Sequence, residues 1–322
     1  MPEPSPSPHA TILVCYHKFS TPIIASEILR PIIVGAANMG AKALQEKLES
    51  KLPRKLRLGG GKQILLDSSG DNISHLNANF CELTAMYWAW KNVDSSYYGL
   101  FHYRRILDLS PKAQHIRTDY PIFTSSRRYN PKRYGLTSQN ITKLLQEYDI
   151  ILPQGYKNHY PSPCDEGLDN YGIYAHYHYA KDLDRIIELI KSRHPEMQAA
   201  LESTLFTKPP RWHIANMFIM RKDLYNEYCQ WLFSLLFDLS KETDLSDYTP
   251  YQARIYGFLS ERMFNIWLEY QRQTTQPRIL EAPMILFMKS IKPLIGWEIN
   301  EKYKRFYFFG LRLYKKRVNP QN

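Results

Sequence analysis

The 322-residue sequence is poor in cysteine and lacks the patterns in which cysteine stabilises secreted or zinc-binding proteins. Its four cysteines, Cys15, Cys81, Cys164 and Cys229, are widely spaced and form no CxxC pair. Cys81 and Cys229 lie in apolar helical patterns, where a free cysteine usually serves as a small core residue. These features exclude a disulfide scaffold and a zinc finger, and they fit a reducing compartment.

Long apolar runs are also missing. No stretch reaches the roughly 18 consecutive apolar residues that a membrane-spanning helix requires. Residues 1–10 are rich in proline and serine and contain no apolar h-region, so we expect a disordered leader rather than a signal peptide. We therefore expect a cytoplasmic protein that is soluble or peripheral on the inner face of the cell membrane.

Motifs for phosphate and metal binding are absent or out of place. The basic segment 57–62, RLGGGK, lacks the GxxxxGK[ST] spacing of a phosphate loop, and we interpret it as a flexible loop. The one literal Asp-x-Asp, Asp182-Leu183-Asp184, lies in an amphipathic helical pattern, which favours a solvated helix face. His176 and His178 have no carboxylate at ligand spacing, so we predict no metal site there.

Positive charge and tyrosine are abundant instead. The formal net charge is +11, which favours an anionic partner such as a nucleotide, a nucleic acid or a membrane surface. The 24 tyrosines offer stacking area with a polar tip, as carbohydrate sites require, although half-buried packing explains most of them. With 44% hydrophobic residues, a chain of this length can bury a large core.

Apolar runs alternate with amphipathic helical patterns from residue 11 to residue 288. The runs predict strands at Thr11–Tyr16, Pro31–Gly35, Tyr97–Phe101, Asp149–Pro153 and Ile214–Met220. The helical patterns cover about 41–52, 76–92, 137–148, the second half of 171–193, 222–239 and 251–272. This alternation predicts an α/β fold, with a mainly parallel sheet flanked by helices, in a domain spanning residues 11–288.

The first strand and the strand at Tyr97–Phe101 both end in polar or cationic residues. Tyr16, His17 and Lys18 follow the first strand, and ligands of open α/β sheets bind beyond the carboxyl ends of strands. The other strand runs into His102-Tyr103-Arg104-Arg105, and strand alternation would place His102 and Arg104 on one face. Because Arg binds phosphate bidentately, the pattern predicts a nucleotide site, with ordinary loops and surface ion pairs as the alternative.

The tail from residue 289 to residue 322 carries nine Lys and Arg against two Glu, interleaved with aromatic residues. This mixture predicts a helix that lies in an anionic membrane interface. Nucleic-acid binding and a docked C-terminal helix with a solvated basic face are the two alternatives.

Six segments, in this order along the chain, resemble a bacterial family of capsular or exopolysaccharide biosynthesis glycosyltransferases, long catalogued as a domain of unknown function. The resemblance covers about residues 11–270 and rests on segments 72–74, 81–92, 99–105, 149–153, 216–220 and 257–262. It implies a GT-A-like, Rossmann-type fold, a nucleotide-sugar donor and a growing glycan acceptor. Some relatives are assigned as galactofuranosyltransferases.

The resemblance also implies a layout for the donor site. GT-A enzymes usually hold a divalent cation with an Asp-x-Asp at a strand end, but here that strand end reads His102-Tyr103-Arg104. We expect Arg104, with His102 or Arg105, to offset the diphosphate charge, so that no cofactor is required. A divalent cation is the alternative. Four residues of a polar turn and the helix start after it are further candidates for donor binding, although helix capping alone would also explain them: Asp71, Asn72, Ser74 and Asn77.

An inverting transfer needs a carboxylate that deprotonates the acceptor hydroxyl. Glu261 is the first candidate because it opens a polar step on an otherwise apolar helix, although an ion pair with a nearby cation would explain it equally well. Asp165 and Asp169 are the other candidates for this role. His178, Asn216 and Arg262 are the predicted acceptor-binding residues.

Together these features predict a hexosyltransferase that extends a lipid-linked cell-surface polysaccharide from a nucleotide sugar. We expect a UDP-linked donor, with UDP-galactofuranose as one candidate, an anionic membrane surface as partner, and no nucleic acid. The alternative is a non-catalytic protein that binds nucleic acid or anionic glycans, and salt-dependent affinity for mixed DNA would support it.

Overall fold

The computed structural model describes residues 9–20, 23–52, 64–126, 129–288, 295–299, 303–308 and 311–317. Most of the predicted leader and the basic loop at 57–62 lie outside the described residues. The first strand already begins at Ala10, so the last residue assigned to the leader belongs to the sheet.

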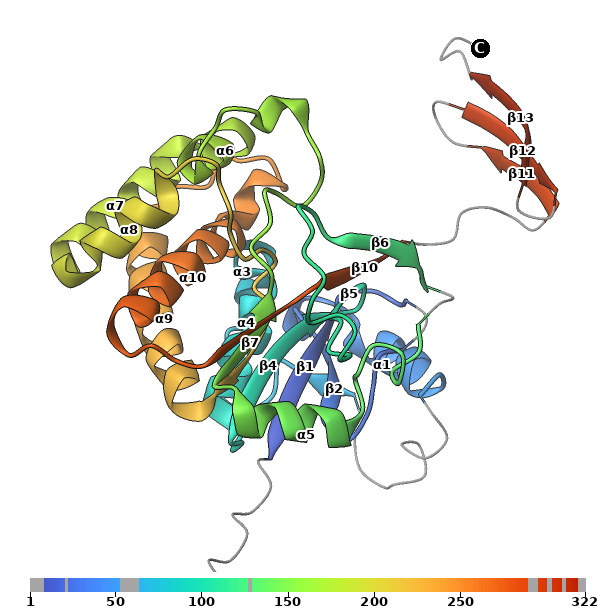
Figure 1. The fold of residues 1–322 in the computed structure, drawn as a ribbon, viewed down its shortest axis with the longest axis horizontal. Coiled ribbons are helices and arrows are strands. Elements are labelled where there is room, and N and C mark those ends of the chain that lie inside the picture. The colour runs from blue at the N-terminus through green and yellow to red at the C-terminus, as the bar shows by residue number, and fades with distance from the viewer. Residues whose placement is uncertain are drawn as a thin grey trace, which may run out of the picture.

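A ten-stranded sheet forms the centre of the molecule (Figure 1). Seven strands follow the order β3-β2-β1-β4-β5-β10-β6, while β8 pairs with β4 and β7, and β7 pairs with β9. The strands are β1 (Ala10–Tyr16), β2 (Leu29–Ile33), β3 (Leu65–Leu66), β4 (Tyr97–His102), β5 (Arg105–Leu107), β6 (Ile122–Ser125), β7 (Ile150–Pro153), β8 (Phe218–Arg221), β9 (Ile279–Ala282) and β10 (Met284–Met288).

Parallel and antiparallel pairs both occur in this sheet. β1 runs parallel to β2 and β4, and β2 runs parallel to β3, as the sequence pattern predicts. β8 lies antiparallel to β4 and β7, and β4 turns back into β5 as a hairpin. The predicted α/β class is confirmed, and the sheet is mixed rather than mainly parallel because these return strands insert beside β4.

β1 shows why its sequence is a continuous apolar run. Leu13 and Cys15 pack into the core on one face of the sheet, whereas Ile12 and Val14 pack into the core on the other face. Successive side chains of a strand point to opposite faces, so a strand covered on both sides needs apolar residues throughout. Gly99 on β4 allows β4 to lie close to β1, because a Cβ at this position would lie 2.9 Å from the Ile12 side chain.

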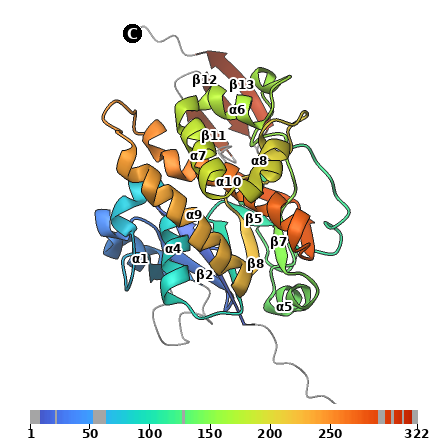
Figure 2. The ribbon, with the colours of Figure 1, turned by 90° about the vertical axis from the view of Figure 1, so that its left-hand side faces the viewer.

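Helices cover both faces of the sheet (Figure 2). α1 (Ala41–Glu49) and α5 (Ser138–Glu147) pack on the face of Ile12. The other face carries α3 (Asn77–Phe80), α4 (Leu83–Asn92), α6 (Asn170–Tyr177), α7 (Ala180–Arg193), α8 (Gln198–Leu205), α9 (Lys222–Glu242) and α10 (Ile255–Thr274). The helices predicted at about 41–52, 137–148, 222–239 and 251–272 are confirmed, whereas α8 is not among the predicted elements.

The predicted continuous helix ending near Asn92 is broken at Cys81. Cys81 has φ 51°, in the positive range that L-residues rarely adopt, and it separates α3 from α4. Gly257 of α10 packs against the break, where a Cβ would lie 3.1 Å from Cys81 Sγ. The break therefore brings α10 directly onto the start of α4.

Three other predicted elements differ in extent. The strand predicted at 214–220 begins only at Phe218, because Ala215 and Asn216 have φ values of 74° and 48°. The helix predicted in the second half of 171–193 is α7, and the first half of this segment is also helical as α6, with His178 and Tyr179 between the two helices. Residues 108–136 contain β6, a strand that the apolar runs do not predict.

The tail contains strands rather than the predicted helix. β11 (Ile295–Ile299), β12 (Tyr303–Phe308) and β13 (Leu311–Arg317) form a separate antiparallel sheet. Aromatic residues at short intervals favour strands, and this preference outweighs the amphipathic charge pattern that suggested a helix. Among the described ranges, no helix combines the length and apolar character that crossing a bilayer demands.

Candidate active site

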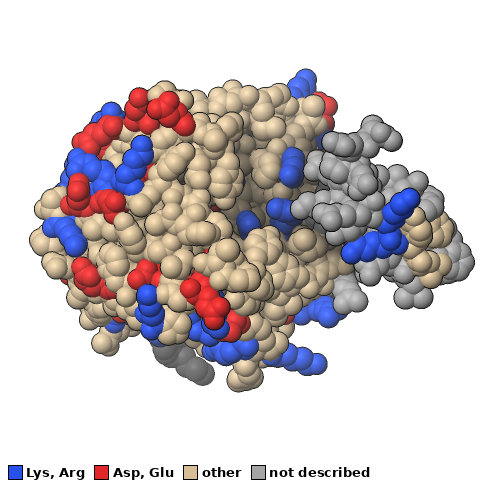
Figure 3. All heavy atoms as spheres, turned by 90° about the horizontal axis from the view of Figure 1, so that it is seen from above, with Lys and Arg blue, Asp and Glu red and all other residues tan. Residues whose placement is uncertain are grey.

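A cavity of about 850 Å³ lies between the ends of β1 and β4 and the first turns of α10. This volume is typical of a site that encloses a small organic ligand. Figure 3 shows a hollowed face of the molecule with Lys and Arg atoms inside the hollow. Five cations and two carboxylates line the cavity: Lys18, Arg104, Arg105, Arg254 and Arg262, with Glu82 and Glu261.

The side of the cavity formed by β1, β4, β5 and the turns that follow them is called the sheet wall. Its residues are His17, Lys18, His102, Tyr103, Arg104 and Arg105. Tyr103 organises this wall, with the His17 ring edge-on at 5.1 Å between centroids. The Lys18 ammonium lies 5.9 Å and the Arg104 guanidinium 5.3 Å from the centre of the Tyr103 ring. One aromatic ring is thus in contact with two cations at the strand ends.

The β4–β5 hairpin decides where the cationic cluster points. β4 ends at His102, and the chain turns so that His102 pairs directly with Arg105. The predicted strand alternation through Arg104 is therefore wrong, because residues 103 and 104 form the turn. His102 Nε2 bonds the Ala215 carbonyl oxygen at 2.8 Å, and burial lowers the pKa of His102. Arg105 Nε is buried and has no hydrogen-bond partner among the described residues.

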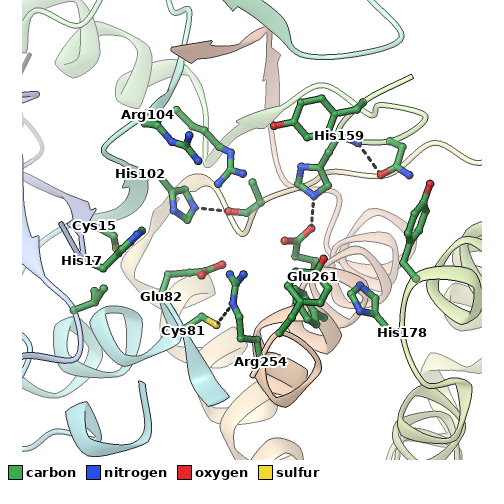
Figure 4. Close-up of a pocket in the computed structure, with 18 of the residues that line it drawn as sticks. Cys15, His17, Cys81, Glu82, His102, Arg104, His159, His178, Arg254 and Glu261 are labelled. Atoms are coloured by element: carbon green, nitrogen blue, oxygen red, sulfur yellow. Dashed lines mark hydrogen bonds and ion pairs between the residues drawn. The ribbon is translucent and has the colours of Figure 1, made fainter. Parts of the chain in front are cut away.

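The floor of the cavity is the break between α3 and α4. Arg254, just before α10, donates from Nε to Cys81 Sγ at 3.2 Å. Burial raises the pKa of the Cys81 thiol to about 11, so the thiol is neutral beside this cation. Glu82 Oε1 accepts from Asn216 Nδ2 at 2.9 Å. Figure 4 shows Glu82 and Arg254 below the ends of β1 and β4.

The opposite side of the cavity is called the helix wall. Its residues come from α10, the turn before α10, the end of α6 and the loop after β7: His159, His178, Tyr251, Phe258, Glu261 and Arg262. His159 Nε2 and Glu261 Oε2 lie 3.2 Å apart (Figure 4). Burial raises the pKa of Glu261, but the facing His159 and the neighbouring Arg262 outweigh it and lower the pKa to about 2.

Arg262 is the most deeply buried cation of the cavity, with 5% of its surface exposed. Its guanidinium carbon lies 3.5 Å from the centre of the Trp212 ring and 5.7 Å from that of Tyr174. Within the described residues its Nε has no hydrogen-bond partner. Burial lowers the pKa of Arg262 to about 10, which leaves it charged at neutral pH. A buried cation with a free donor is suited to an anionic or hydroxylated ligand.

Aromatic rings dominate the outer part of the helix wall. His178 stacks on Phe258 with 4.0 Å between centroids, and Tyr251 lies 5.2 Å from Phe258. Burial lowers the pKa of His178 to about 4, so this ring is neutral. Tyr251 is 56% exposed. The helix wall thus offers uncharged ring faces where the sheet wall offers cations.

The family described as "Domain of unknown function (DUF4422)" matches residues 11–273. The chain belongs to this family. The matched region includes every strand of the ten-stranded sheet except β9 and β10, and all residues of the cavity. A search of curated proteins gives no match.

One solved structure similar to this DUF4422 chain is described as "WbbM bifunctional glycosytransferase apo structure". The two share 27% sequence identity with a TM-score of 0.71, over 90% of this chain and 48% of the other. This chain therefore spans about half the length of that protein. Its central sheet flanked by helices is similar to a GT-A-like glycosyltransferase fold.

The cavity brings together nine of the predicted site residues from segments far apart in the sequence. They are His17, Lys18, Asn77, His102, Arg104, Arg105, His178, Glu261 and Arg262. Their distribution over both walls agrees with a site built from strand ends on one side and helices on the other. Tyr16, predicted beside them, instead lies in the core, where its hydroxyl accepts from the Ile24 N–H at 2.9 Å.

Three residues predicted to bind the donor maintain the turn before α3 instead. Asn72 closes the turn through bonds to Gly70 and Ser74. Asp71 accepts from the Tyr87 hydroxyl at 3.3 Å, and Ser74 donates to the buried Asp67 carboxylate at 2.5 Å. These three side chains are not among those that line the cavity. Their polar character is explained by local hydrogen bonding.

Two predicted carboxylates and one predicted amide lie behind the cavity lining. Asp165 accepts from the lining residues Asn158 and Tyr177, at 2.7 and 2.9 Å. Asp169 caps α6 by accepting from the Gly172 N–H at 2.7 Å. Asn216 supports Glu82 and also donates to Ser260 Oγ at 2.9 Å. We therefore assign these residues to supporting roles.

The Asp-x-Asp sequence is not placed to hold a metal ion. Asp182 is buried and accepts from the Tyr248 hydroxyl at 2.6 Å, so the expected solvated face is wrong for this residue. Asp184 accepts from the Tyr171 hydroxyl, and neither carboxylate lines the cavity. Among the described residues, no three His, Cys, Asp or Glu side chains are grouped for a metal ion.

Among the lining residues that the sequence-based predictions lack are Glu82, His159, Trp212 and Arg254. Glu82 lies within segment 81–92 of the family resemblance, so the sequence contained a signal that could have identified it as a site residue. His159 lies in a long loop, and Arg254 lies at the entrance to α10, where nothing local distinguishes them from solvated residues. Only the tertiary fold brings these two residues into the cavity.

Proposed function

We propose that this DUF4422 chain is a glycosyltransferase that moves a hexose from a nucleotide sugar to a growing lipid-linked polysaccharide. The donor is a UDP-sugar, and UDP-galactofuranose is the first candidate. One observation carries the proposal: five cations converge on one cavity from both walls and its floor, against two carboxylates. A nucleoside diphosphate has the charge and size to fill such a site.

The sheet wall binds the diphosphate in this proposal. Lys18 and Arg104 both contact the Tyr103 ring, and Arg105 Nε is buried without a hydrogen-bond partner among the described residues. Cationic groups aimed at a leaving diphosphate stabilise the charge that develops as the sugar departs. Arg104 and Arg105 therefore do the work that a divalent cation does in other transferases, and the reaction proceeds without a metal cofactor.

The helix wall receives the acceptor glycan. Tyr251, Phe258 and the neutral His178 provide ring faces on which the C–H face of a sugar stacks. Arg262 lies deeper and offers a donor to an acceptor hydroxyl. The similar WbbM protein is described as a bifunctional glycosyltransferase, which supports a transferase reaction for this chain.

The basic tail holds the enzyme at an anionic membrane surface on the cytoplasmic side, where a lipid-linked acceptor resides. In the tail sheet, Lys304 pairs in register with Lys316, and Arg305 pairs with Lys315. The nine cations of residues 289–322 support the same partner.

A thermal-shift series with UDP, GDP, CMP and dTDP, each with manganese or with excess EDTA, tests the proposal. A ligand that binds the folded state raises the melting temperature by mass action. We expect a rise with UDP that EDTA does not change. No rise with any nucleotide would contradict the enzyme function, whereas a rise that depends on manganese would contradict the metal-free diphosphate site.

A further inference from the structure

His159 and Glu261 form a pair on the helix wall that the chain assembles over a separation of 102 residues. The side chains are 26% and 14% exposed, and Nε2 lies 3.2 Å from Oε2. The edge-on Trp212 ring, 5.8 Å away at 86°, fixes the plane of the imidazole. The imidazole is thus oriented from two sides while it faces the cavity.

The contact with Glu261 determines which imidazole nitrogen is free. A neutral imidazole whose Nε2 faces a carboxylate carries its proton on Nε2, and Nδ1 keeps a lone pair. No described residue donates a hydrogen bond to His159 Nδ1. Nδ1 is therefore the one unpaired basic atom of this pair.

The Glu261 carboxylate is already engaged, because Oε2 contacts His159 Nε2 and the carboxylate also accepts from the Ala215 N–H. Burial raises its pKa, whereas a protonated His159 and Arg262 lower it. A general base works best when its pKa lies near the working pH. Imidazole is the side chain that most often serves as a general base, and His159 keeps a free ring nitrogen for this role.

The charges around His159 come from three elements. α10 contributes Glu261 and the buried Arg262, whose guanidinium stacks on Trp212. The loop after β7 contributes Asp165, which bonds the neighbouring Asn158. The end of α6 contributes His178, which is neutral. In the described part of the chain, Glu261 is the carboxylate in direct contact with the imidazole, and it favours the imidazolium form.

We propose that His159 is the general base of the transfer and that Glu261 is its positioning residue; the inference rests on the proposed function. The acceptor hydroxyl gives its proton to Nδ1 of His159 as its oxygen bonds the anomeric carbon. The bond from that carbon to the diphosphate oxygen breaks, and its electron pair leaves with the nucleotide. Glu261 stabilises the imidazolium that forms.

The test measures UDP release by the full-length chain from UDP-galactofuranose, UDP-galactose and UDP-glucose, with water as acceptor, between pH 5 and pH 9. His159→Gln is expected to lower kcat about 100-fold or more. Glu261→Gln is expected to lower kcat and to move the acidic limb of the pH profile down by about one pH unit, because it removes the charge that favours the imidazolium. UDP-induced thermal shifts of both variants should match the wild type.

His176→Gln is the control, because His176 lies on α6 outside the cavity lining, and it should release UDP at the wild-type rate. A wild-type rate in His159→Gln would overturn the role of His159 and leave the proposed function intact. An unmoved acidic limb in Glu261→Gln would overturn the positioning role. A wild-type chain that releases no UDP from any donor would overturn the proposed function and the inference together.

Discussion

The two walls of the cavity differ in how they hold their functional groups. On the sheet wall, backbone pairing between β4 and β5 fixes His102 and Arg105, and Lys18 and Arg104 contact the Tyr103 ring. On the helix wall, side chains hold one another: His159 with Glu261, and His178 with Phe258. The first arrangement presents charge, and the second presents a base and ring faces.

This difference matches two chemical tasks. A diphosphate is bound by charge placed on a rigid frame, and the strand ends supply that frame. Proton transfer and sugar stacking need side chains whose pKa and ring orientation are adjusted by neighbours. A variant on one wall should therefore affect donor affinity and a variant on the other should affect turnover or acceptor affinity.

The largest difference between the two walls is expected from Arg104→Ala on the sheet wall, as a loss of UDP affinity. Loss of a charge-assisted contact of about 2 kcal/mol weakens UDP binding roughly 30-fold. Isothermal titration with UDP measures the effect. Arg133→Ala is a matched control, because Arg133 is exposed and lies 5.8 Å from the Tyr134 ring outside the cavity lining. Equal UDP affinities of the two variants would contradict the assignment of the sheet wall.

A smaller effect is expected from Tyr251→Ala on the helix wall. The exposed Tyr251 ring contributes a stacking contact of about 1 kcal/mol, so the KM for the glycan acceptor should rise about fivefold. The affinity for UDP should stay unchanged. Initial transfer rates against acceptor concentration, beside UDP titration, measure both quantities. A variant that loses UDP affinity instead would show that the walls do not divide the substrates in this way.

The helix wall should also make the protein sensitive to acid. Burial holds the pKa of His178 at about 4 in the folded state, below its ordinary value of 6.5. Between pH 6.5 and pH 4 the unfolded chain therefore binds a proton that the folded chain does not, and stability falls as pH falls. His178→Gln should reduce the loss of Tm between pH 7 and pH 5 by about 2–4 °C.

Differential scanning fluorimetry between pH 7 and pH 5 measures the slope of Tm against pH. Buried His213, whose pKa burial also lowers to about 4, remains in the variant, so part of the acid sensitivity should persist. If the slope of Tm against pH were unchanged in His178→Gln, protonation of His178 would not reduce the stability of the folded protein.

The smallest change is expected from metal removal. Because the sheet wall supplies Arg104 and Arg105 for the diphosphate, UDP release should stay within about twofold in excess EDTA. Rates before and after dialysis against EDTA, then with added manganese, measure this. Complete loss restored by manganese would show that the cations of the sheet wall do not replace a metal ion.

Much of the fold could be predicted from the sequence because its signals are local. The continuous apolar run of β1 indicated a strand covered on both faces, and the periodic apolar residues of α9 and α10 indicated their helices. The helix predicted in the tail was the main error, since amphipathic basic and aromatic residues suit a helix and a strand almost equally. Pairing among β11, β12 and β13 decides between them.

The candidate site was predictable where residues follow strands. His17, Lys18 and Arg104 lie at strand ends, so a general rule about open sheets placed them correctly in the cavity. His159 and Arg254 were missed because their neighbours in the sequence do not determine their neighbours in space. The positive φ of Cys81 and its contact with Gly257 bring α10 to the cavity floor. Neither feature can be predicted from local sequence patterns.

Ala215 shows how closely the two walls depend on each other. Its carbonyl accepts from His102 on one wall, and its N–H bonds Glu261 on the other, with the residue held at φ 74°. A non-glycine residue in this conformation costs roughly 1 kcal/mol. An attempt to re-engineer the enzyme for a bulkier sugar by widening the cleft here would disturb phosphate recognition and proton transfer at once. Both walls therefore depend on this single residue, and adaptation to new substrates has more freedom at the exposed aromatic rim.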